Sequence, residues 1–127
     1  MNRRRFIALC LALTASAKSV YAQDGDDVIP GFDDAAAAGA PVLVHVTAPW
    51  CEVCQIQKPI VADLLSRHGF EGMKKFDVDY DTQKEVLARH RVTTQSTMIV
   101  FRGGQEVDRA VGQTDPAAIE ALLRKAL

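Results

Sequence analysis

The chain has 127 residues, of which 48% are hydrophobic and 24% charged, and its formal net charge is −1. This length suits one small domain with a single core. The sequence contains no internal repeat and lacks the strongly basic composition that would favour nucleic acid as a partner.

The first 22 residues are typical of an export signal rather than of a folded element. Three arginines at 3–5 precede an apolar stretch over 6–17, and small residues at 20 and 22 suit a cleavage site. The stretch is shorter than the ~20 residues that cross a bilayer, so we expect a cleaved signal peptide over 1–22, with an uncleaved anchor as the alternative. The arginines also allow export by the twin-arginine route.

The remaining domain, residues 23–127, is distinctly acidic, because four of the 15 basic residues and none of the 16 acidic ones lie in the signal. An acidic domain without a basic patch argues against nucleic acid and anionic membrane surfaces as partners. We expect this domain to act in a bacterial periplasm, as a monomer.

Hydrophobic periodicity and turn residues predict helices and strands that alternate along this domain. In chain order they are a helix over 32–38, a strand over 42–46, a helix from 51 to about 68, a strand over 73–79, a helix over 82–90, a strand over 97–101, a strand over 106–111 and a helix from 116 to about 126. Asp81 or Thr82 is expected to cap the third helix, and Asp115 the last one, ahead of Pro116.

This order predicts an α/β fold with a mixed sheet between two helical layers. Strands joined through helices are expected to be parallel neighbours, and the hairpin at Gly103-Gly104 adds an antiparallel edge. On the helix from 51 to about 68, the apolar residues predict one buried face, made of Ile56, Ile60, Val61, Leu64 and Leu65.

The segment WCEVC at 50–54 directly follows the apolar strand over 42–46 and begins the long helix. A helix N-terminus presents free N–H groups and the positive end of the macrodipole, which favour a thiolate on Cys51. Cys54 lies one helical turn later, so the two cysteines can cycle between dithiol and disulfide. A purely structural disulfide is the alternative, but a bridge that closes so short a loop removes little entropy from the unfolded chain.

These features resemble the thioredoxin family over nearly all of the domain. The resemblance is carried by the strand over 42–46, Trp50-Cys51-x-x-Cys54, Pro59, Lys75 before the strand over 76–79, the Gly-Gly hairpin, Gly112 and the amphipathic last helix. It implies a thioredoxin-like three-layer sandwich, with helices on both faces of a mixed sheet. It also implies thiol–disulfide exchange through a Cys51–Cys54 disulfide, with no cofactor and no metal beyond the two sulfurs.

The chain departs from the family pattern at three places. Glu52-Val53 separates the cysteines where thioredoxins usually have Gly-Pro, and His45 takes the place of a buried aspartate. Ser96 stands where family members carry a cis-proline. A cis bond before serine costs ~3–4 kcal/mol, so we expect the bond between Gln95 and Ser96 to be trans.

The resemblance and the placement of the residues assign candidate roles. Cys51 is the expected nucleophile and the more exposed sulfur, and Cys54 is expected to resolve the mixed disulfide. His45 is a candidate acceptor for the Cys54 proton, with a satisfied core histidine as the alternative. Glu52 adds negative charge beside Cys51, which disfavours the thiolate and predicts a reducing couple.

Three further residues are candidates for binding the substrate. Trp50 is expected to form an apolar platform beside the nucleophile. Backbone groups of Thr94 and Gln95, next to Ser96, are expected to pair with an extended substrate strand. Ser96 also removes a bulky ring from the sulfurs, which leaves open a soft-metal or iron–sulfur carrier that uses the same cysteines.

The expected partners are exported proteins that contain disulfides. The sequence has no flavin or nicotinamide motif, so the electrons must come from another protein, for which a membrane thiol-electron transporter is the candidate. A module that grips extended peptides without turning them over is a further alternative.

Overall fold

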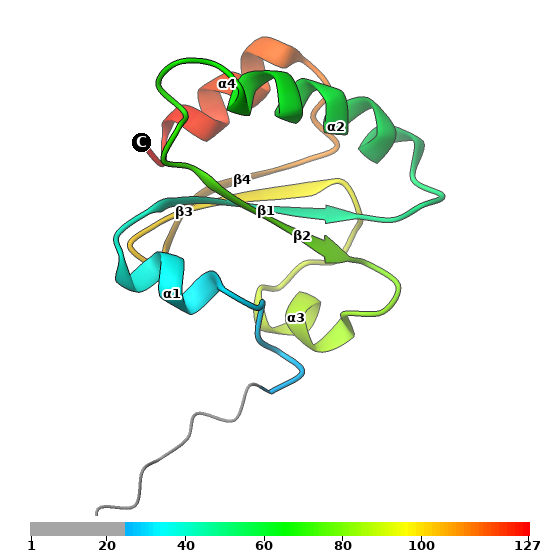
Figure 1. Ribbon diagram of the computed structural model, residues 1–127. Helices are drawn as coiled ribbons and strands as arrows, with labels where there is room; N and C mark the ends of the chain where they lie inside the picture. The colour runs from blue at the N-terminus through cyan, green and yellow to red at the C-terminus, as the bar shows by residue number, and fades with distance from the viewer. Residues whose placement is uncertain (1–24) are drawn as a thin grey trace, which may run out of the picture.

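The computed structural model describes residues 25–127, which form a four-stranded sheet with helices on both faces (Figure 1). The expected signal peptide over 1–22 lies outside the described residues. The elements are α1 (Phe32–Ala37), β1 (Pro41–Thr47), α2 (Glu52–Leu65), β2 (Lys74–Asp79), α3 (Lys84–Arg89), β3 (Thr97–Arg102), β4 (Gln105–Val111) and α4 (Pro116–Arg124). The helices α2 and α4 cover one face, and α1 and α3 the other. This confirms the α/β class and the predicted layers.

The strand order is β2-β1-β3-β4, with β1 parallel to β2 and antiparallel to β3. The predicted antiparallel hairpin of β3 and β4 is present. The expectation that every strand joined through a helix is a parallel neighbour was wrong for β3. The six-residue α3 spans about 9 Å and cannot return the chain along a strand of about 20 Å. The strand β3 therefore starts at the end of the sheet where β2 stops and runs the opposite way.

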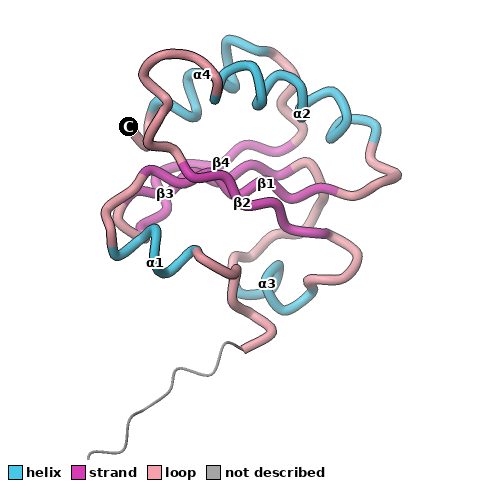
Figure 2. Tube along the Cα trace, viewed as in Figure 1, coloured by secondary structure: helices cyan, strands magenta, loops and turns pink. Residues whose placement is uncertain are grey.

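Two apolar clusters lie on the two sides of the sheet. Figure 2 shows this sheet between the two layers of helices. On β1, Leu43 belongs to the cluster under α2 and α4, whereas Val42 and Val44 belong to the cluster under α1 and α3. Because side chains alternate along a strand, His45 faces the same side as Leu43, toward α2. The fold thus places a histidine under the helix that begins at the cysteines.

The buried face of α2 differs from the predicted one at two positions. Its buried residues are Cys54, Gln57, Val61 and Leu64. Ile56, which was expected to be buried, is 51% exposed. Residues that follow one another at intervals of three or four from Cys54 face the sheet, and these positions include Gln57. Ile56 lies outside this series, so its side chain points to solvent.

The helix termini agree with the sequence at α4 and not at α3. Asp115 accepts from the N–H of Ala118 at 3.1 Å and Pro116 is the first helical residue, as predicted. The N-cap of α3 is Gln83, with no side-chain cap. The residues expected to cap α3 instead donate their N–H groups to the carboxylate of Asp79.

None of the helices within residues 25–127 is long and apolar enough for a bilayer crossing.

Candidate active site

The cysteine pair lies where β1 passes into α2. Cys51 is the N-cap of α2, and its sulfur accepts from the backbone N–H of Cys54 at 3.1 Å. The turn before it is closed by a hydrogen bond from the Cys51 N–H to the carbonyl of Ala48 at 3.1 Å. The two cysteines are joined by a disulfide, with their Cα atoms 5.3 Å apart. The Cys51 sulfur thus lies at the N-terminus of α2, next to the free N–H groups of the first helical turn.

Both cysteines are largely covered by protein. Cys51 is 3% exposed and Cys54 is fully buried. Cys51 is thus the more exposed of the two cysteines, as expected, but its exposed fraction is much smaller than that of a freely accessible thiol. The sulfur of Cys54 lies 3.9 Å from the carbonyl oxygen of Val46. A partner can therefore reach the pair only from the Cys51 side.

His45 is buried on β1, directly beside Val46. Its Nε2 lies 2.8 Å from Oε1 of Gln57. Burial lowers the pKa of His45 below its ordinary value, against the hydrogen bond with Gln57 and the charge of Asp77, which raise it. His45 and Asp77 are partners in the β1–β2 register. The ring is therefore neutral near pH 7 and able to accept a proton.

Gln57 is a site residue that the sequence interpretation missed. It is fully buried on α2. Its Nε2 donates to the carbonyls of Ser96 at 3.2 Å and Gln113 at 2.9 Å, while its Oε1 faces His45. One side chain thus links α2 to β1, to the loop before β3 and to the segment before α4. The signal in the sequence was an amide three residues after Cys54, on the face that continues to Val61.

Ser96 occupies the place where the family carries a cis-proline, and its conformation is different. All peptide bonds among residues 25–127 are trans, as expected for the bond from Gln95 to Ser96. The φ angle of Ser96 is 62°, in the left-handed region that favours glycine. Its N–H donates to the carbonyl of Val46 at 2.9 Å, and its carbonyl accepts from Gly112 at 3.1 Å. The loop is thereby fixed to the strand beside the disulfide.

The remaining candidate for substrate binding on this loop is Gln95, which is half-buried. Its carbonyl accepts from the hydroxyl of Ser96, and its side-chain oxygen accepts from the hydroxyl of Thr94 at 3.1 Å. These bonds hold the loop in one shape next to the cysteines.

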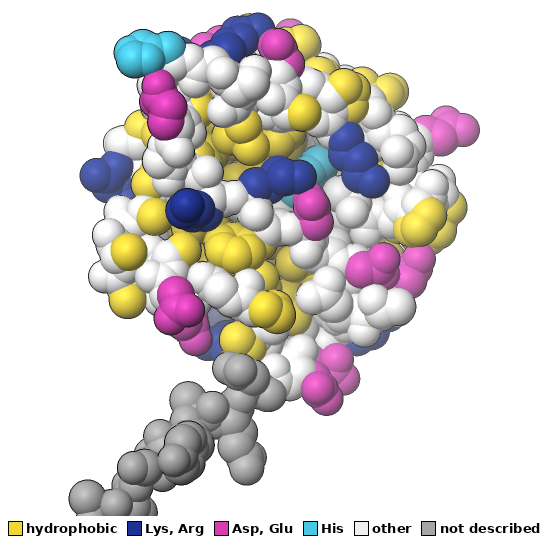
Figure 3. Space-filling view, viewed as in Figure 1, with side chains coloured by type: hydrophobic (Ala, Val, Ile, Leu, Met, Phe, Trp, Pro, Cys, Tyr) yellow, Lys and Arg dark blue, Asp and Glu magenta, His cyan; other side chains and the backbone are white. Residues whose placement is uncertain are grey.

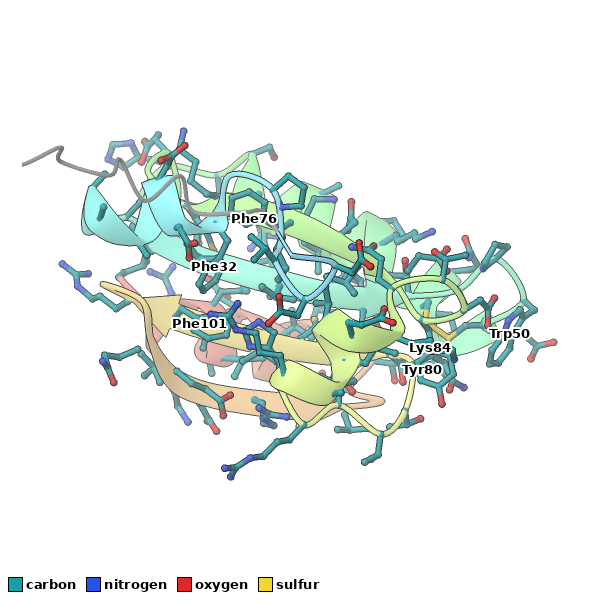
Figure 4. The ribbon with its side chains drawn as sticks, turned by 90° about the horizontal axis from the view of Figure 1, so that it is seen from below. Phe32, Trp50, Phe76, Tyr80, Lys84 and Phe101 are labelled. Atoms are coloured by element: carbon teal, nitrogen blue, oxygen red, sulfur yellow. A yellow bond between two sulfur atoms is a disulfide. The ribbon has the colours of Figure 1, made fainter. Side chains whose placement is uncertain are left out.

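Trp50 is 56% exposed and is held at the edge of the site. Its Nε1 donates to Oδ2 of Asp81 at 2.9 Å. Its ring meets Tyr80 edge to face at 6.2 Å, and the Lys84 ammonium lies 4.5 Å from the centre of the Tyr80 ring. Figure 4 shows the three labelled side chains together at one end of the molecule. The indole is therefore exposed and held by a hydrogen bond to an ionisable neighbour, and its role as an apolar platform stays a prediction.

Charged side chains of both signs are intermixed on the face in Figure 3, and no basic patch gathers there. Within residues 25–127, no group of three or more His, Cys, Asp and Glu side chains could hold a metal ion. The soft-metal interpretation thus gains no complete donor set from the described part of this chain.

The family model described as Thioredoxin matches residues 29–125. The chain belongs to the thioredoxin family. Among curated proteins, it is 33% identical over 88 residues to Thioredoxin 1 of Nostoc sp., an alignment that covers 68% of this chain and 80% of the relative. It is also 33% identical over 95 residues to a thioredoxin of Mycolicibacterium smegmatis, covering 74% of this chain and 85% of the relative.

Solved structures agree with this assignment. The crystal structure of Trxlp from Edwardsiella tarda shares 44% identity and a TM-score of 0.72, covering 73% of this chain and 90% of that one. A mutant thioredoxin from Halobacterium salinarum shares 26% identity and a TM-score of 0.65, covering 74% and 80%. The domain is thus a thioredoxin-family thiol–disulfide oxidoreductase with the redox-active Cys51–Cys54 pair of the family motif.

Proposed function

We propose that this thioredoxin-family protein is exported and reduces disulfides in other exported proteins, with Cys51 as the nucleophile. The observation that carries the proposal is the position of Cys51 at the N-cap of α2, where its sulfur accepts from the Cys54 N–H. In the reduced protein the same N–H group and the helix macrodipole stabilise a thiolate on Cys51. The buried Cys54 is placed to react only with Cys51.

The exchange proceeds in two steps that balance. The Cys51 thiolate attacks one sulfur of a partner's disulfide, and the other partner sulfur leaves as a thiolate and takes up a proton. Cys54 then loses its proton and attacks the Cys51 sulfur. The second partner sulfur leaves, and the Cys51–Cys54 disulfide forms. The partner gains two electrons and two protons, and the cysteine pair loses them.

His45 is the proposed acceptor for the Cys54 proton. It is the residue next to Val46, whose carbonyl lies 3.9 Å from the Cys54 sulfur. Because burial keeps the ring neutral near pH 7, it can take the proton at the moment Cys54 attacks. This gives His45 the task of a general base in the second step.

The proposed direction is reducing. Glu52 is exposed in the first turn of α2, directly after Cys51. Its negative charge disfavours the Cys51 thiolate and so makes the reduced form a better electron donor. We expect a reduction potential near the ~ −270 mV of a thioredoxin. A potential near ~ −120 mV, at the strongly oxidising end of the family, would contradict the reducing direction.

The proposed location and partners follow from the first 22 residues and from the chemistry. The arginines, apolar stretch and small residues of 1–22 support export to a periplasm. There the reductant would be a membrane thiol-electron transporter and the substrates would be exported proteins with disulfides. Cell fractionation tests this: the full chain should be found in the periplasm, and a chain lacking 1–22 should stay in the cytoplasm.

Recognition of the partner is proposed to use the rim of the site. Trp50 offers an exposed aromatic face, and the loop of Gln95 and Ser96 lies beside the cysteines. An extended partner segment would lie along this loop and place its disulfide over Cys51.

Reduction of insulin by the chain without its signal, with dithiothreitol as the electron source, tests the activity. We expect the wild type to accelerate the reaction and Cys51→Ser to be inactive. Cys54→Ser should instead accumulate a mixed disulfide on Cys51. A wild type that binds insulin peptides without accelerating their reduction would refute the proposal in favour of a binding module.

A further inference from the structure

We propose that Gln57 is a positioning residue, which holds His45 as the Nε2–H tautomer and leaves Nδ1 as the ring nitrogen that takes the Cys54 proton. This inference rests on the proposed role of His45 in thiol–disulfide exchange, and it assigns that role to one atom. It goes beyond the cysteine chemistry because it depends on an interior amide that the family motif does not contain.

The orientation of the Gln57 amide is decided by its two backbone partners. Its nitrogen lies 3.2 Å from the carbonyl oxygen of Ser96 and 2.9 Å from that of Gln113. A carbonyl oxygen can only accept, so the amide NH₂ must face both. Turning the amide over would bring its oxygen against two other oxygens in a buried site. The Oε1 atom therefore faces the interior, toward His45.

This orientation decides the tautomer of His45. Oε1 of Gln57 lies 2.8 Å from Nε2 of His45, and an amide oxygen can only accept. Nε2 must therefore carry a hydrogen. A neutral imidazole has one N–H, so Nδ1 is bare and can accept a proton.

The bare nitrogen lies in the interior. His45 is 1% exposed, and the hydrogen bond of its ring is the one between Nε2 and Gln57. Nδ1 is thus left with its lone pair for the Cys54 proton.

The charges around the ring come from the neighbouring strand and helix. Asp77 on β2 favours an imidazolium, whereas Lys75 on β2 and Lys58 on α2 disfavour it. The partner of His45 on β3 is Met98, which is uncharged. Lys75 and Asp77 also pair with each other at 3.0 Å, which reduces the effect of either charge on the ring. The ring can therefore be charged briefly and then return to the neutral state.

In the resolving step, the proton moves from the sulfur of Cys54 to Nδ1 of His45, while Nε2–H stays bonded to Gln57. The Cys54 thiolate forms a bond to the Cys51 sulfur. The bond between Cys51 and the partner sulfur breaks, and the partner leaves with the electron pair. Cys54 is oxidised and the partner sulfur is reduced.

Two substitutions at Gln57 separate positioning from packing. Gln57→Leu and Gln57→Glu both remove the donors to the carbonyls of Ser96 and Gln113. Only Gln57→Glu keeps an oxygen that accepts from Nε2–H. A purely structural role predicts the same change of rate in both variants at every pH, whereas the positioning role predicts that Gln57→Leu alone loses the Nε2–H tautomer.

Nitrogen NMR of the ¹⁵N-labelled histidines is the first measurement, since a protonated and a bare ring nitrogen differ strongly in chemical shift. His45 is assigned by the loss of its signals in His45→Asn. Near pH 7 the wild type should show Nε2–H and a bare Nδ1, and Gln57→Leu should show a mixture of tautomers. Gln57→Glu should keep the hydrogen on Nε2 and lose the proton of Nδ1 only at higher pH, because a carboxylate stabilises the imidazolium. An Nδ1–H tautomer in the wild type, or an unchanged tautomer in Gln57→Leu, would overturn the inference.

The second measurement is the resolving rate, followed by release of thionitrobenzoate from its mixed disulfide with Cys51. Gln57→Leu should slow this step by about tenfold. Attack by Cys51, measured in a Cys54→Ser background, should be unchanged. Gln57→Glu should move the pH profile upward, because a carboxylate stabilises the imidazolium, and should recover the wild-type rate at higher pH. Equal slowing of both variants across the whole pH range would overturn the positioning role.

The two proposals fail differently. If the wild type does not accelerate insulin reduction, the proposed function fails, whereas the NMR result is independent of turnover. If insulin is reduced but the tautomer is not the Nε2–H form, the inference about Gln57 fails and the cysteine chemistry stands.

Discussion

The backbone N–H of Ser96 donates to the carbonyl of Val46 at 2.9 Å, and the sulfur of Cys54 lies 3.9 Å from that same oxygen. One carbonyl of β1 thus meets both the loop before β3 and the buried cysteine. The bond from Ser96 requires an N–H, which proline lacks. The serine at this place is therefore part of the loop's hydrogen bonding and is not a neutral replacement for the family's proline.

Ser96→Pro should destabilise the protein. The proline ring fixes φ near −65°, whereas Ser96 has φ of 62°, and the bond to Val46 would also be lost. We expect the free energy of unfolding in urea to fall by about 3 kcal/mol. The control is Ser96→Gly, which adopts this φ without strain and should change stability by less than about 1 kcal/mol. A Ser96→Pro variant as stable as the wild type would show that the loop can take another conformation.

His45 and Gln57 should be strongly coupled in stability. Gln57→Leu leaves the His45 Nε2–H and two carbonyls without their partner, so we expect a loss of about 2–4 kcal/mol. His45→Leu leaves the amide oxygen unpaired and should also destabilise. In the double variant both ends of the bond between His45 and Gln57 are absent, so neither is left buried without a partner. The loss of free energy of unfolding should therefore be smaller than the sum of the two single losses by about 1 kcal/mol or more. Additive losses in the urea-unfolding cycle would contradict a direct bond.

Stability should fall as the pH is lowered below about 6.5. Burial lowers the pKa of His45 in the folded chain, so below ~6.5 the unfolded chain binds a proton that the folded chain does not. The free energy of unfolding should therefore be highest above that pH and decline toward the folded pKa. Burial also lowers the pKa of His90, which contributes in the same direction.

Urea unfolding between pH 8 and pH 5 measures this dependence. His45→Asn and His90→Gln should each flatten the decline. Gln55→Ala is the control, because Gln55 is exposed and does not titrate, so it should leave the profile unchanged. A wild type whose stability stays constant or rises on acidification would refute the buried neutral state.

The contact between Trp50 and Asp81 should govern the mobility of the indole. Trp50 is the single tryptophan of the chain, so fluorescence reports on it alone. Asp81→Ala removes the acceptor 2.9 Å from Nε1, and we expect lower fluorescence anisotropy of Trp50. The loss of stability should stay within about 1 kcal/mol, because the bond is exposed. Asp81→Asn keeps an acceptor and should behave like the wild type. Equal anisotropy in all three proteins would mean that packing on Tyr80 holds the ring.

Local signals in the sequence predicted most of the elements correctly. Asp115 and Pro116 start α4, and Gly103-Gly104 turns the hairpin of β3 and β4, because each of these residues acts through backbone groups a few positions away. The predicted direction of β3 and the predicted burial of Ile56 were wrong, because both depend on how the elements pack against one another. Gln57 was missed for the same reason, since its partners lie 12, 39 and 56 residues away along the chain.

The sequence alone determined the family, the layers of the fold and the pair of sulfurs at the start of a helix. These follow from periodicity, turn residues and a motif of five adjacent positions, which need no knowledge of distant contacts. Only the tertiary structure brought His45, Gln57 and Ser96 into one buried hydrogen-bonded group. Burial is the physical reason: a polar side chain in the interior must find a partner from whichever segment the packing brings next to it.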